Sequence, residues 1–250
     1  MRPMRLVPPP PQRLPGGGHS RSSPLPSLKV SEIFYSIQGE GILAGMPGVF
    51  VRLSGCNLRC VWCDTPYTSW KPEGEQRTLK EILAEVHEHR AAHVVVTGGE
   101  PMIAPQIAEF TRGLKDLGLH ITIETAGTVY APVACDLMSI SPKLANSTPP
   151  GSWAAQHERL RYQPATLCHL MREYEYQLKF VVCDPADLAE IEKVLAETAA
   201  DRTRVVLMAE GTTAETIHGR APWIAEICKR EGFRYSPRLH IDLWGNQRAR

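Results

Sequence analysis

The sequence lacks the features that direct a protein to nucleic acid or to a membrane. Its 250 residues hold 28 lysines and arginines against 27 aspartates and glutamates, which leaves a formal net charge of +1. A chain this close to neutral has no global field that would favour a polyanion or an anionic surface. No apolar run approaches the length of a transmembrane helix, and the N-terminal segment has arginines without the apolar stretch of a secretory signal. We therefore expect no nucleic-acid partner, no membrane association and a cytoplasmic location.

A disulfide framework is also lacking. The chain has seven cysteines, and those outside one short stretch form no pair with a regular spacing. They are Cys135, Cys168, Cys183 and Cys228. Such scatter indicates a reducing compartment, and we expect these cysteines to lie in the core. The sequence also shows no nucleophile motif, so covalent catalysis by a side chain is not expected.

The remaining cysteines form the most informative feature of the chain. Cys56, Cys60 and Cys63 have the spacing CxxxCxxC. Three thiolates on one tight loop can hold three irons of a four-iron cluster, whereas the electron-transfer arrangement uses four cysteines. Three ligands leave one iron free to bind a small molecule, which suits catalysis. Two alternatives are a zinc site, which usually takes two separated pairs of ligands, and a reduced cysteine cluster without metal.

Residues 1–27 differ in composition from the rest of the chain. They include the runs Pro8–Pro11 and Gly16–Gly18 together with several arginines and serines. Such a segment buries too little apolar surface to offset the entropy of ordering. We expect a disordered extension over 1–27 and one folded domain over 28–250.

From residue 28 onward, strand and helix signals alternate. The expected strands are 29–35, 49–53, 93–97, 120–124, 137–140, 177–182 and 204–208, and the expected helices are 79–90, 106–117, 185–199 and 213–230. Thr78 and Glu81 have the spacing of a capping box at the first of these helices, and 239–244 alternates like a strand. Repeated βα units predict an α/β fold with a parallel sheet. Six or so parallel strands are too few for an eight-stranded barrel, so we expect a partial (incomplete) parallel β/α barrel.

Four unusual loops follow predicted strands, at 56–63, 97–101, 124–128 and 141–143. The carboxyl ends of parallel strands meet at one edge, where ligands of such folds bind. Gly98 and Gly99 allow a ligand close to the backbone, Glu100 suits an ammonium group, Glu124 suits ribose hydroxyls and Lys143 suits a carboxylate. Each of these also has a structural interpretation as a turn or a solvated loop residue.

Further candidates lie near the first two strands. Gln38 and Glu40, next to Gly39 and Gly41, suit a flat polar heterocycle, and Arg52 suits a substrate carboxylate or a structural ion pair. Asp64 and Thr65 offer oxygen ligands for Mg²⁺, although the spacing alone favours an Asp-Thr-Pro turn.

Histidines supply the last candidates. His87, His89 and His93 resemble a metal cluster, but we interpret them as a solvated face. His240 is either a ligand-binding residue or a satisfied polar group.

The CxxxCxxC spacing resembles the signature of the radical S-adenosylmethionine (radical SAM) enzymes, and Thr97–Pro101 resembles their GGE motif. The resemblance implies that the open iron binds S-adenosylmethionine, which an electron from the cluster cleaves to a 5′-deoxyadenosyl radical. It also implies an external electron donor of the flavodoxin type.

A set of motifs, in order, narrows the resemblance to the 7-carboxy-7-deazaguanine synthase family over residues 28–250. The set is Ser36–Gly41, Phe50–Cys56, Cys63–Thr65, Thr97–Pro101, Glu124–Thr128, Ser141–Lys143, Gln177–Val182 and Leu239–His240. The family implies ring contraction of 6-carboxy-5,6,7,8-tetrahydropterin to 7-carboxy-7-deazaguanine with loss of ammonia, in queuosine and 7-deazapurine biosynthesis. It also implies regeneration of S-adenosylmethionine, assistance by Mg²⁺, and a homodimer.

The resemblance gives each matching residue a role. The [4Fe-4S] ligands are Cys56, Cys60 and Cys63, and the Mg²⁺ ligand is Thr65. Substrate positions are Ile37, Gln38, Gly39, Glu40, Arg52, Thr97 and His240. Positions around S-adenosylmethionine are Trp62, Cys63, Asp64, Gly99, Glu100, Glu124, Ser141, Pro142, Lys143 and Gln177. Residues 244–250 receive no role.

Two other functions remain as alternatives. A glycyl-radical activating enzyme shares the cysteine spacing but needs neither a heterocycle pocket nor a cation site. A zinc- or cluster-binding interaction protein would not require four converging loops.

Overall fold

The structure is a computed structural model that describes residues 25–250. Its strands are β1 (Ser27–Ile37), β2 (Pro47–Leu53), β3 (Glu75–Thr78), β4 (His93–Gly98), β5 (His120–Thr125), β6 (Leu137–Ile140), β7 (Tyr176–Val182), β8 (Val205–Ala209) and β9 (Arg234–Ser236). Its α-helices are α1 (Pro66–Ser69), α2 (Leu79–Glu88), α3 (Ile107–Asp116), α4 (Ala154–Arg161), α5 (Pro164–Glu173), α6 (Asp187–Thr198), α7 (Ala214–Glu231) and α8 (Leu239–Trp244).

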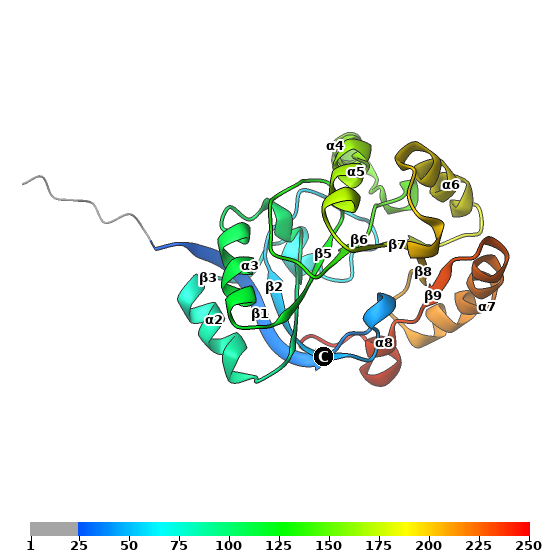
Figure 1. The fold of residues 1–250 in the computed structure, drawn as a ribbon. Coiled ribbons are helices and arrows are strands. Elements are labelled where there is room, and N and C mark those ends of the chain that lie inside the picture. Colours follow the sequence, from blue (N-terminus) through cyan, green and yellow to red (C-terminus); the bar gives the residue numbers. More distant parts are fainter. Residues whose placement is uncertain (1–24) are drawn as a thin grey trace, which may run out of the picture.

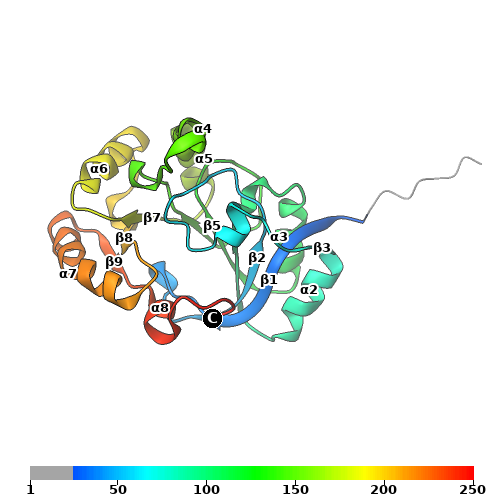
Figure 2. The ribbon, with the colours of Figure 1, turned by 180° about the vertical axis from the view of Figure 1, so that it is seen from behind.

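All the strands belong to one sheet, in the order β3-β1-β2-β4-β5-β6-β7-β8-β9. Neighbours from β2 to β9 are parallel, whereas β1 runs antiparallel to β2 and β3. The sheet curves, with its longer helices on the outside (Figures 1 and 2). Because β3 and β9 end the strand order without pairing to each other, the barrel is open. The expected incomplete α/β barrel is confirmed, with an antiparallel strand that the βα pattern did not predict.

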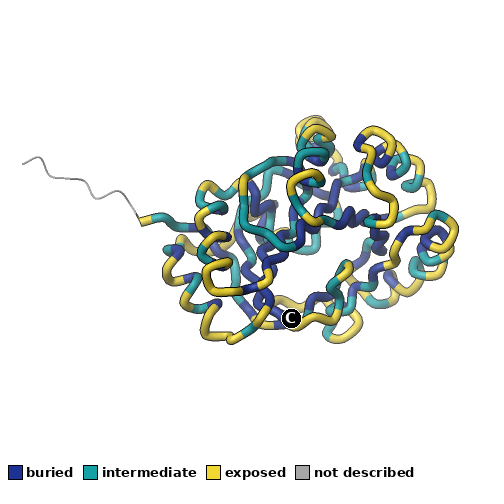
Figure 3. Tube along the Cα trace, in the orientation of Figure 1, coloured by how far each residue is buried: buried dark blue, intermediate teal, exposed yellow. Residues whose placement is uncertain are grey.

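Successive side chains along a strand point alternately to the apolar core beneath the helices and to the barrel interior. Val94 and Val96 of β4 pack in the large apolar core with the helices, while Val95 points the other way, against Phe34 and Phe50. The two phenylalanine rings stack with centroids 5.1 Å apart. In Figure 3 the strands are largely buried and the exposed segments lie mainly on the outer helices. Inward-facing side chains of the parallel strands are therefore free to line a site.

Most predicted elements are confirmed to within two residues at each end, and the capping box between Thr78 and Glu81 is present. The strands β3 and β9, which are short and have few apolar residues, were not predicted, and neither were the helices α1, α4 and α5. The strand expected over 239–244 is wrong, because this segment is the helix α8. Only Ile241 is buried there while Leu243 is half exposed, so its apolar residues do not share one buried face as they would in a strand.

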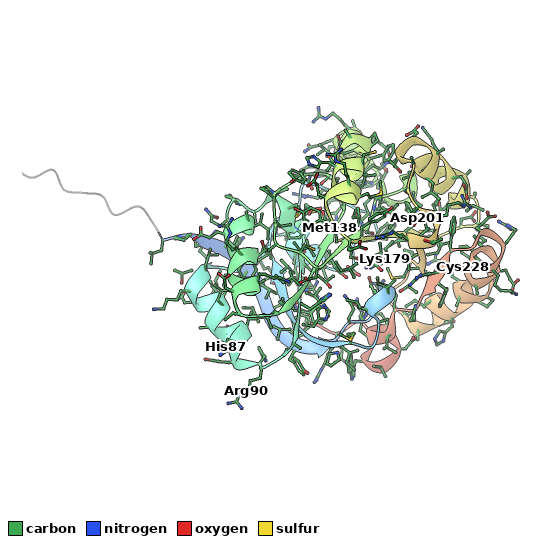
Figure 4. All side chains as sticks on the ribbon, viewed as in Figure 1. His87, Arg90, Met138, Lys179, Asp201 and Cys228 are labelled. Carbon is green, nitrogen blue, oxygen red and sulfur yellow. The ribbon has the colours of Figure 1, made fainter. Side chains whose placement is uncertain are left out.

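Two further expectations need correction. His93 is not part of a solvated face: it is buried in β4, where Nε2 lies 2.9 Å from Thr122 Oγ1, and burial lowers its pKa to about 4. His87 and His89 are exposed as expected, with His87 at the outer helix α2 (Figure 4). Among the four scattered cysteines only Cys228 is buried.

The expectation for residues 1–27 falls largely on residues 1–24, which lie outside the described part of the chain. Within residues 25–250, no helix combines the length and the apolar character needed to span a membrane.

Removing the cap of α2 tests how far this helix supports the fold. Thr78→Ala removes the hydroxyl that accepts from Glu81 N and donates to Glu81 Oε2, so we expect the free energy of unfolding to fall by about 1 kcal/mol. Urea denaturation of the cluster-free protein measures this change. Thr78→Ser keeps the hydroxyl and should retain most of the stability; equal losses in the two variants would contradict the capping role.

Candidate active site

A cavity of about 500 Å³ lies at the carboxyl edge of the parallel strands. All four loops predicted to converge contribute to its wall, together with the β1–β2 connection and residues near α8. The predicted site residues on the wall are Ile37, Gln38, Gly39, Glu40, Arg52, Cys56, Cys60, Trp62, Cys63, Asp64, Thr65, Thr97, Gly99, Glu124, Ser141, Lys143 and His240. Glu100, Pro142 and Gln177 are buried and do not line the cavity.

The cysteine loop after β2 is shaped by contacts of its backbone and of its side chains. Arg59 Nη1 donates to Cys56 O at 2.8 Å, Cys63 N donates to Cys60 O at 3.3 Å, and the Cys63 thiol lies 3.2 Å from Ser69 Oγ. Desolvation raises the pKa of Cys56 to about 12 and that of Cys60 to about 11. Thiols so buried ionise only with a compensating positive charge, such as a bound metal.

These thiols fit a multi-iron cluster better than a single ion. All three are free and line the same cavity. Within residues 25–250, no three His, Cys, Asp or Glu residues are placed to hold one metal ion. A four-iron cluster binds each thiolate at a different iron, so its ligands need not converge on a point. The donor set therefore fits the cluster that the spacing predicts.

The glycines of the loop after β4 bring its backbone against the cysteine loop. A Cβ on Gly99 would collide with Gly55 O and approach Cys56 Cβ to 2.9 Å. Glu100 turns away from the cavity: it accepts hydrogen bonds from Thr125 Oγ1 at 2.8 Å, from Ala126 N at 2.8 Å and from Met102 N at 3.1 Å. Burial raises its pKa. Glu100 thus ties the β4 loop to the β5 loop, while Gly99 forms the wall.

Glu124, at the end of β5, lies among three polar side chains. Gln38 Nε2 donates to its Oε1 at 3.2 Å and Thr97 Oγ1 to its Oε2 at 3.3 Å. Lys179 Nζ lies 3.5 Å from Oε1. Residues expected at the substrate and at S-adenosylmethionine therefore contact one another directly.

Glu40 lies at the centre of a buried ion network. Its carboxylate pairs with Lys179 and, at 3.1 Å, with Arg238 Nε, and Arg238 also pairs with Asp64. Burial alone would raise the pKa of Glu40, but Lys179, Arg238 and His240 together hold it well below its usual range. For Asp64 burial is likewise opposed by Arg238, which lowers the pKa. Both carboxylates are therefore ionised within the cavity wall.

Gly39 and His240 are also in close contact. Leu239 N donates to Gly39 O at 2.9 Å, and a Cβ on Gly39 would collide with His240 Nδ1. Burial lowers the pKa of His240, so the imidazole is neutral near pH 7. The absence of a side chain at Gly39 is what lets His240 reach the cavity.

Arg52 forms the structural ion pair that was one of its two interpretations. Its Nε lies 2.6 Å from Glu32 Oε1, an oxygen that also accepts from Tyr67 Oη at 2.9 Å. No hydrogen bond from the terminal nitrogens of Arg52 to residues 25–250 is present, and the side chain lines the cavity. Arg52 is thus oriented by Glu32 and retains donors for a ligand.

Thr65 occupies the N-cap position of α1, but its side chain accepts no capping hydrogen bond. Thr65 lines the cavity, and its hydroxyl lies 3.9 Å from Cys63 Sγ. A turn thus exists here, as the structural interpretation expected, and it leaves the Thr65 oxygen available.

The loop after β6 completes the wall. Lys143 Nζ donates to Ser141 O and Oγ, each at 2.8 Å, and lies 5.9 Å from the centre of the Trp62 ring. Gln177 stays behind the wall, where it donates to Ser139 Oγ at 2.7 Å and accepts from Ile42 N at 2.9 Å.

Several parts of the wall were not predicted from the sequence. Lys179 is a lysine in an apolar strand, on the same side as Gln177, and this placement was a readable signal. Arg238 precedes the motif at Leu239–His240, but nothing in its spacing indicates that it joins Glu40 to Asp64. Residues 246–248 and 250 also line the cavity, and no motif marks them.

Comparison with known proteins identifies similar chains. A model of the Radical SAM superfamily matches residues 50–144. The 7-carboxy-7-deazaguanine synthase of Halobacterium salinarum is 48% identical over 237 residues, which cover 88% of this chain and 92% of that protein. The synthase of Rhodopirellula baltica is 42% identical over 240 residues, covering 94% and 92%.

A solved structure shows the same likeness. The crystal structure of QueE from Escherichia coli superposes with a TM-score of 0.63 at 25% identity, covering 84% of this chain and 93% of that one. Similarity over nearly the full length of the curated relatives is more than a shared barrel requires. The chain therefore belongs to the 7-carboxy-7-deazaguanine synthase family of radical SAM enzymes.

Proposed function

We propose that this chain contracts the ring of 6-carboxy-5,6,7,8-tetrahydropterin to 7-carboxy-7-deazaguanine, with loss of ammonia, as a carbon–nitrogen lyase of 7-deazapurine and queuosine biosynthesis. One observation carries the proposal. A single cavity brings the three thiols of the cysteine loop together with the polar residues of the Gln38–Glu40 loop, Thr97 and Arg52. A radical reaction needs its reactants held in line and shielded, rather than a side-chain nucleophile.

The protein's own residues then bind and orient. Cys56, Cys60 and Cys63 would hold the [4Fe-4S] cluster, and the loops at Gly99 and Ser141–Lys143 would hold S-adenosylmethionine. When bound, these two groups supply the radical that starts the reaction. Lys143, a cation on the wall, suits the carboxylate of S-adenosylmethionine.

On the substrate side, the ionised Glu40 and the amide of Gln38 match the donors and acceptors of a pterin ring. The free donors of Arg52 match its carboxylate. Thr65, with the carboxylate of the substrate, would complete an oxygen site for Mg²⁺.

The alternative of a glycyl-radical activating enzyme is not favoured, because the curated relatives that cover most of the chain are named synthases. We also infer that the domain over 28–250 acts as a homodimer in the cytoplasm and receives its electron from a separate protein. The motifs that resemble the family support these inferences.

Turnover of the reconstituted protein tests the proposed function. Under anaerobic conditions, with S-adenosylmethionine, Mg²⁺, dithionite and the carboxy-tetrahydropterin, we expect many product molecules per S-adenosylmethionine by mass spectrometry. Cys60→Ala should abolish product. Release of deoxyadenosine without pterin product would keep the radical chemistry and reject the substrate.

Thr65→Ala tests the Mg²⁺ ligand. Because the Thr65 side chain makes no cap bond, we expect unchanged stability but a Mg²⁺ concentration for half-maximal turnover raised about tenfold, equivalent to about 1.4 kcal/mol. Thr65→Ser keeps the oxygen and should restore the wild-type Mg²⁺ dependence. An unchanged Mg²⁺ dependence in Thr65→Ala would remove Thr65 from the cation site.

Lys179→Met tests the buried positive charge that lies between Glu40 and Glu124. It leaves Glu40 and Glu124 with one cation fewer in a buried site, so we expect a loss of about 3–5 kcal/mol in the free energy of unfolding. The surviving enzyme should have a raised KM for the pterin. Lys193→Met, at an exposed position on α6, is the matched control and should change stability by about 0.5 kcal/mol or less. Equal free energies of unfolding in the two variants would show that the charge of Lys179 does not stabilise the fold.

A further inference from the structure

The cysteine loop and the loop after β6 arise from strands that are not neighbours. In the strand order, β2 and β6 are separated by β4 and β5, so three strand spacings of about 4.8 Å each lie between them. The first loop would hold the cluster, and the second, Ser141–Lys143, would hold S-adenosylmethionine. A misplacement of about 1 Å in a reacting pair can slow a reaction about a hundredfold. The separation of the two loops therefore needs a support that the sheet alone does not supply.

A buried hydrogen-bond relay connects the two loops. Arg59 N donates to His157 Nδ1 at 3.1 Å, and His157 Nε2 lies 2.9 Å from Ser147 Oγ. Ser147 Oγ in turn donates to Leu144 O at 2.6 Å. The side chains of His157 and Ser147 belong to residues that are at most 1% exposed. The relay thus runs from the residue before the second cluster cysteine to the residue after Lys143.

The donors and acceptors of the relay have one consistent direction. Because the Arg59 amide can only donate, His157 Nδ1 is the acceptor, and the neutral ring carries its proton on Nε2. Nε2–H then donates to Ser147 Oγ, whose own proton goes to the Leu144 carbonyl. Burial lowers the pKa of His157, so the ring is neutral near pH 7. Aligned hydrogen bonds in a buried chain polarise and strengthen one another, which favours a fixed distance between the two ends.

Neighbouring contacts fasten the same two loops. Val61 N, in the cysteine loop, donates to Ser147 O at 2.9 Å. Arg161 lies four positions after His157 on α4, and its Nη1 donates to Lys143 O at 3.0 Å. The helix α4 therefore contacts both loops, with His157 toward the cysteine loop and Arg161 toward the loop after β6.

His93 shows that burial alone does not give a histidine this placement. It is as buried as His157, and its Nε2 lies 2.9 Å from Thr122 Oγ1. However, His93 opens β4, at the end of the strand opposite the cavity, and Thr122 lies on the adjacent strand β5. Among residues 25–250 its Nδ1 has no hydrogen-bond partner. His93 thus makes one bond within the sheet, whereas His157 joins two loops of the site.

We propose, on the basis of the proposed function, that His157 is a positioning residue for the reaction. Through Arg59 and Ser147 it sets the separation between the cysteine loop and the Ser141–Lys143 loop, and with it the placement of S-adenosylmethionine at the cluster. His157 does not line the cavity, so it acts only through the residues that do. A histidine that merely filled the core would stabilise the fold without changing the affinity for S-adenosylmethionine.

Amide hydrogen exchange tests the relay in the cluster-free protein. His157→Leu removes the acceptor of the Arg59 amide, so we expect this amide to exchange about tenfold faster or more by NMR. His93→Leu removes an equally buried imidazole outside the site and is the matched control, in which the Arg59 amide should exchange as in wild type. Wild-type exchange of the Arg59 amide in His157→Leu would overturn the proposal.

Binding of S-adenosylmethionine tests the positioning role. In the reduced, reconstituted protein at equal iron content, S-adenosylmethionine changes the electron paramagnetic resonance spectrum of the cluster. We expect the concentration for half of this change to rise about tenfold or more in His157→Leu. The KM for S-adenosylmethionine should rise by the same factor, while the KM for the pterin stays at the wild-type value. His93→Leu should match wild type in every measurement. Wild-type affinity for S-adenosylmethionine in His157→Leu would contradict the positioning role.

Ser147→Ala breaks the other end of the relay and decides the question if His157→Leu does not fold. We expect its affinity for S-adenosylmethionine to fall about threefold to tenfold. The double variant should bind as His157→Leu does, because members of one unit do not contribute additively. Wild-type affinity in Ser147→Ala, or additive losses in the double variant, would overturn the relay. Absence of pterin product from the wild type would instead count against the proposed function, and the exchange and binding measurements, which need no pterin, would still decide the role of His157.

Discussion

The buried charge of Lys179 is the constraint on which the cavity depends. Its side chain is 5% exposed and lies between Glu40 and Glu124, near the centre of the molecule (Figure 4). A lone ammonium group there would be costly to desolvate, and so would either carboxylate. Each charge is tolerated because the others are present. The loop after β1, the end of β5 and the middle of β7 are therefore held in one arrangement by electrostatics, and Arg238 extends the same network to Asp64 in the cysteine loop.

This arrangement prepares the site for its ligands. Glu124 already accepts hydrogen bonds from Gln38 and Thr97, Glu100 already joins two loops, and Glu32 already orients Arg52. Polar groups that satisfy one another in this way need little rearrangement to exchange a partner for a ligand, which lowers the entropic cost of binding. The cysteine loop follows the same principle, because backbone and Arg59 contacts define its course.

The sequence predicted those parts of the molecule that depend on local or periodic signals. The capping box at Thr78, the buried strand at Val94–Val96 and the convergence of loops at one edge of the sheet all follow from short patterns. It did not predict Arg238, because that residue's role arises from contacts with Glu40 and Asp64, which are 198 and 174 positions away. Nor did it predict that Glu100 turns away from the cavity, since the motif alone does not fix which way a carboxylate turns. Apolar and polar residues alternate over 239–244, but a pattern of only six residues is too short to exclude a helix.

The cysteine loop has one side on the cavity and the other in solvent. Cys56, Cys60 and Cys63 line the cavity, from which water and competing reactants have to be excluded, while Val61, Trp70 and Trp153 are exposed. Fastening that loop through His157 and Ser147 keeps the two sides in a fixed relation. On this view α4, which no motif indicates, supports the cysteine loop from outside the cavity, and the ion network around Lys179 supports it from within.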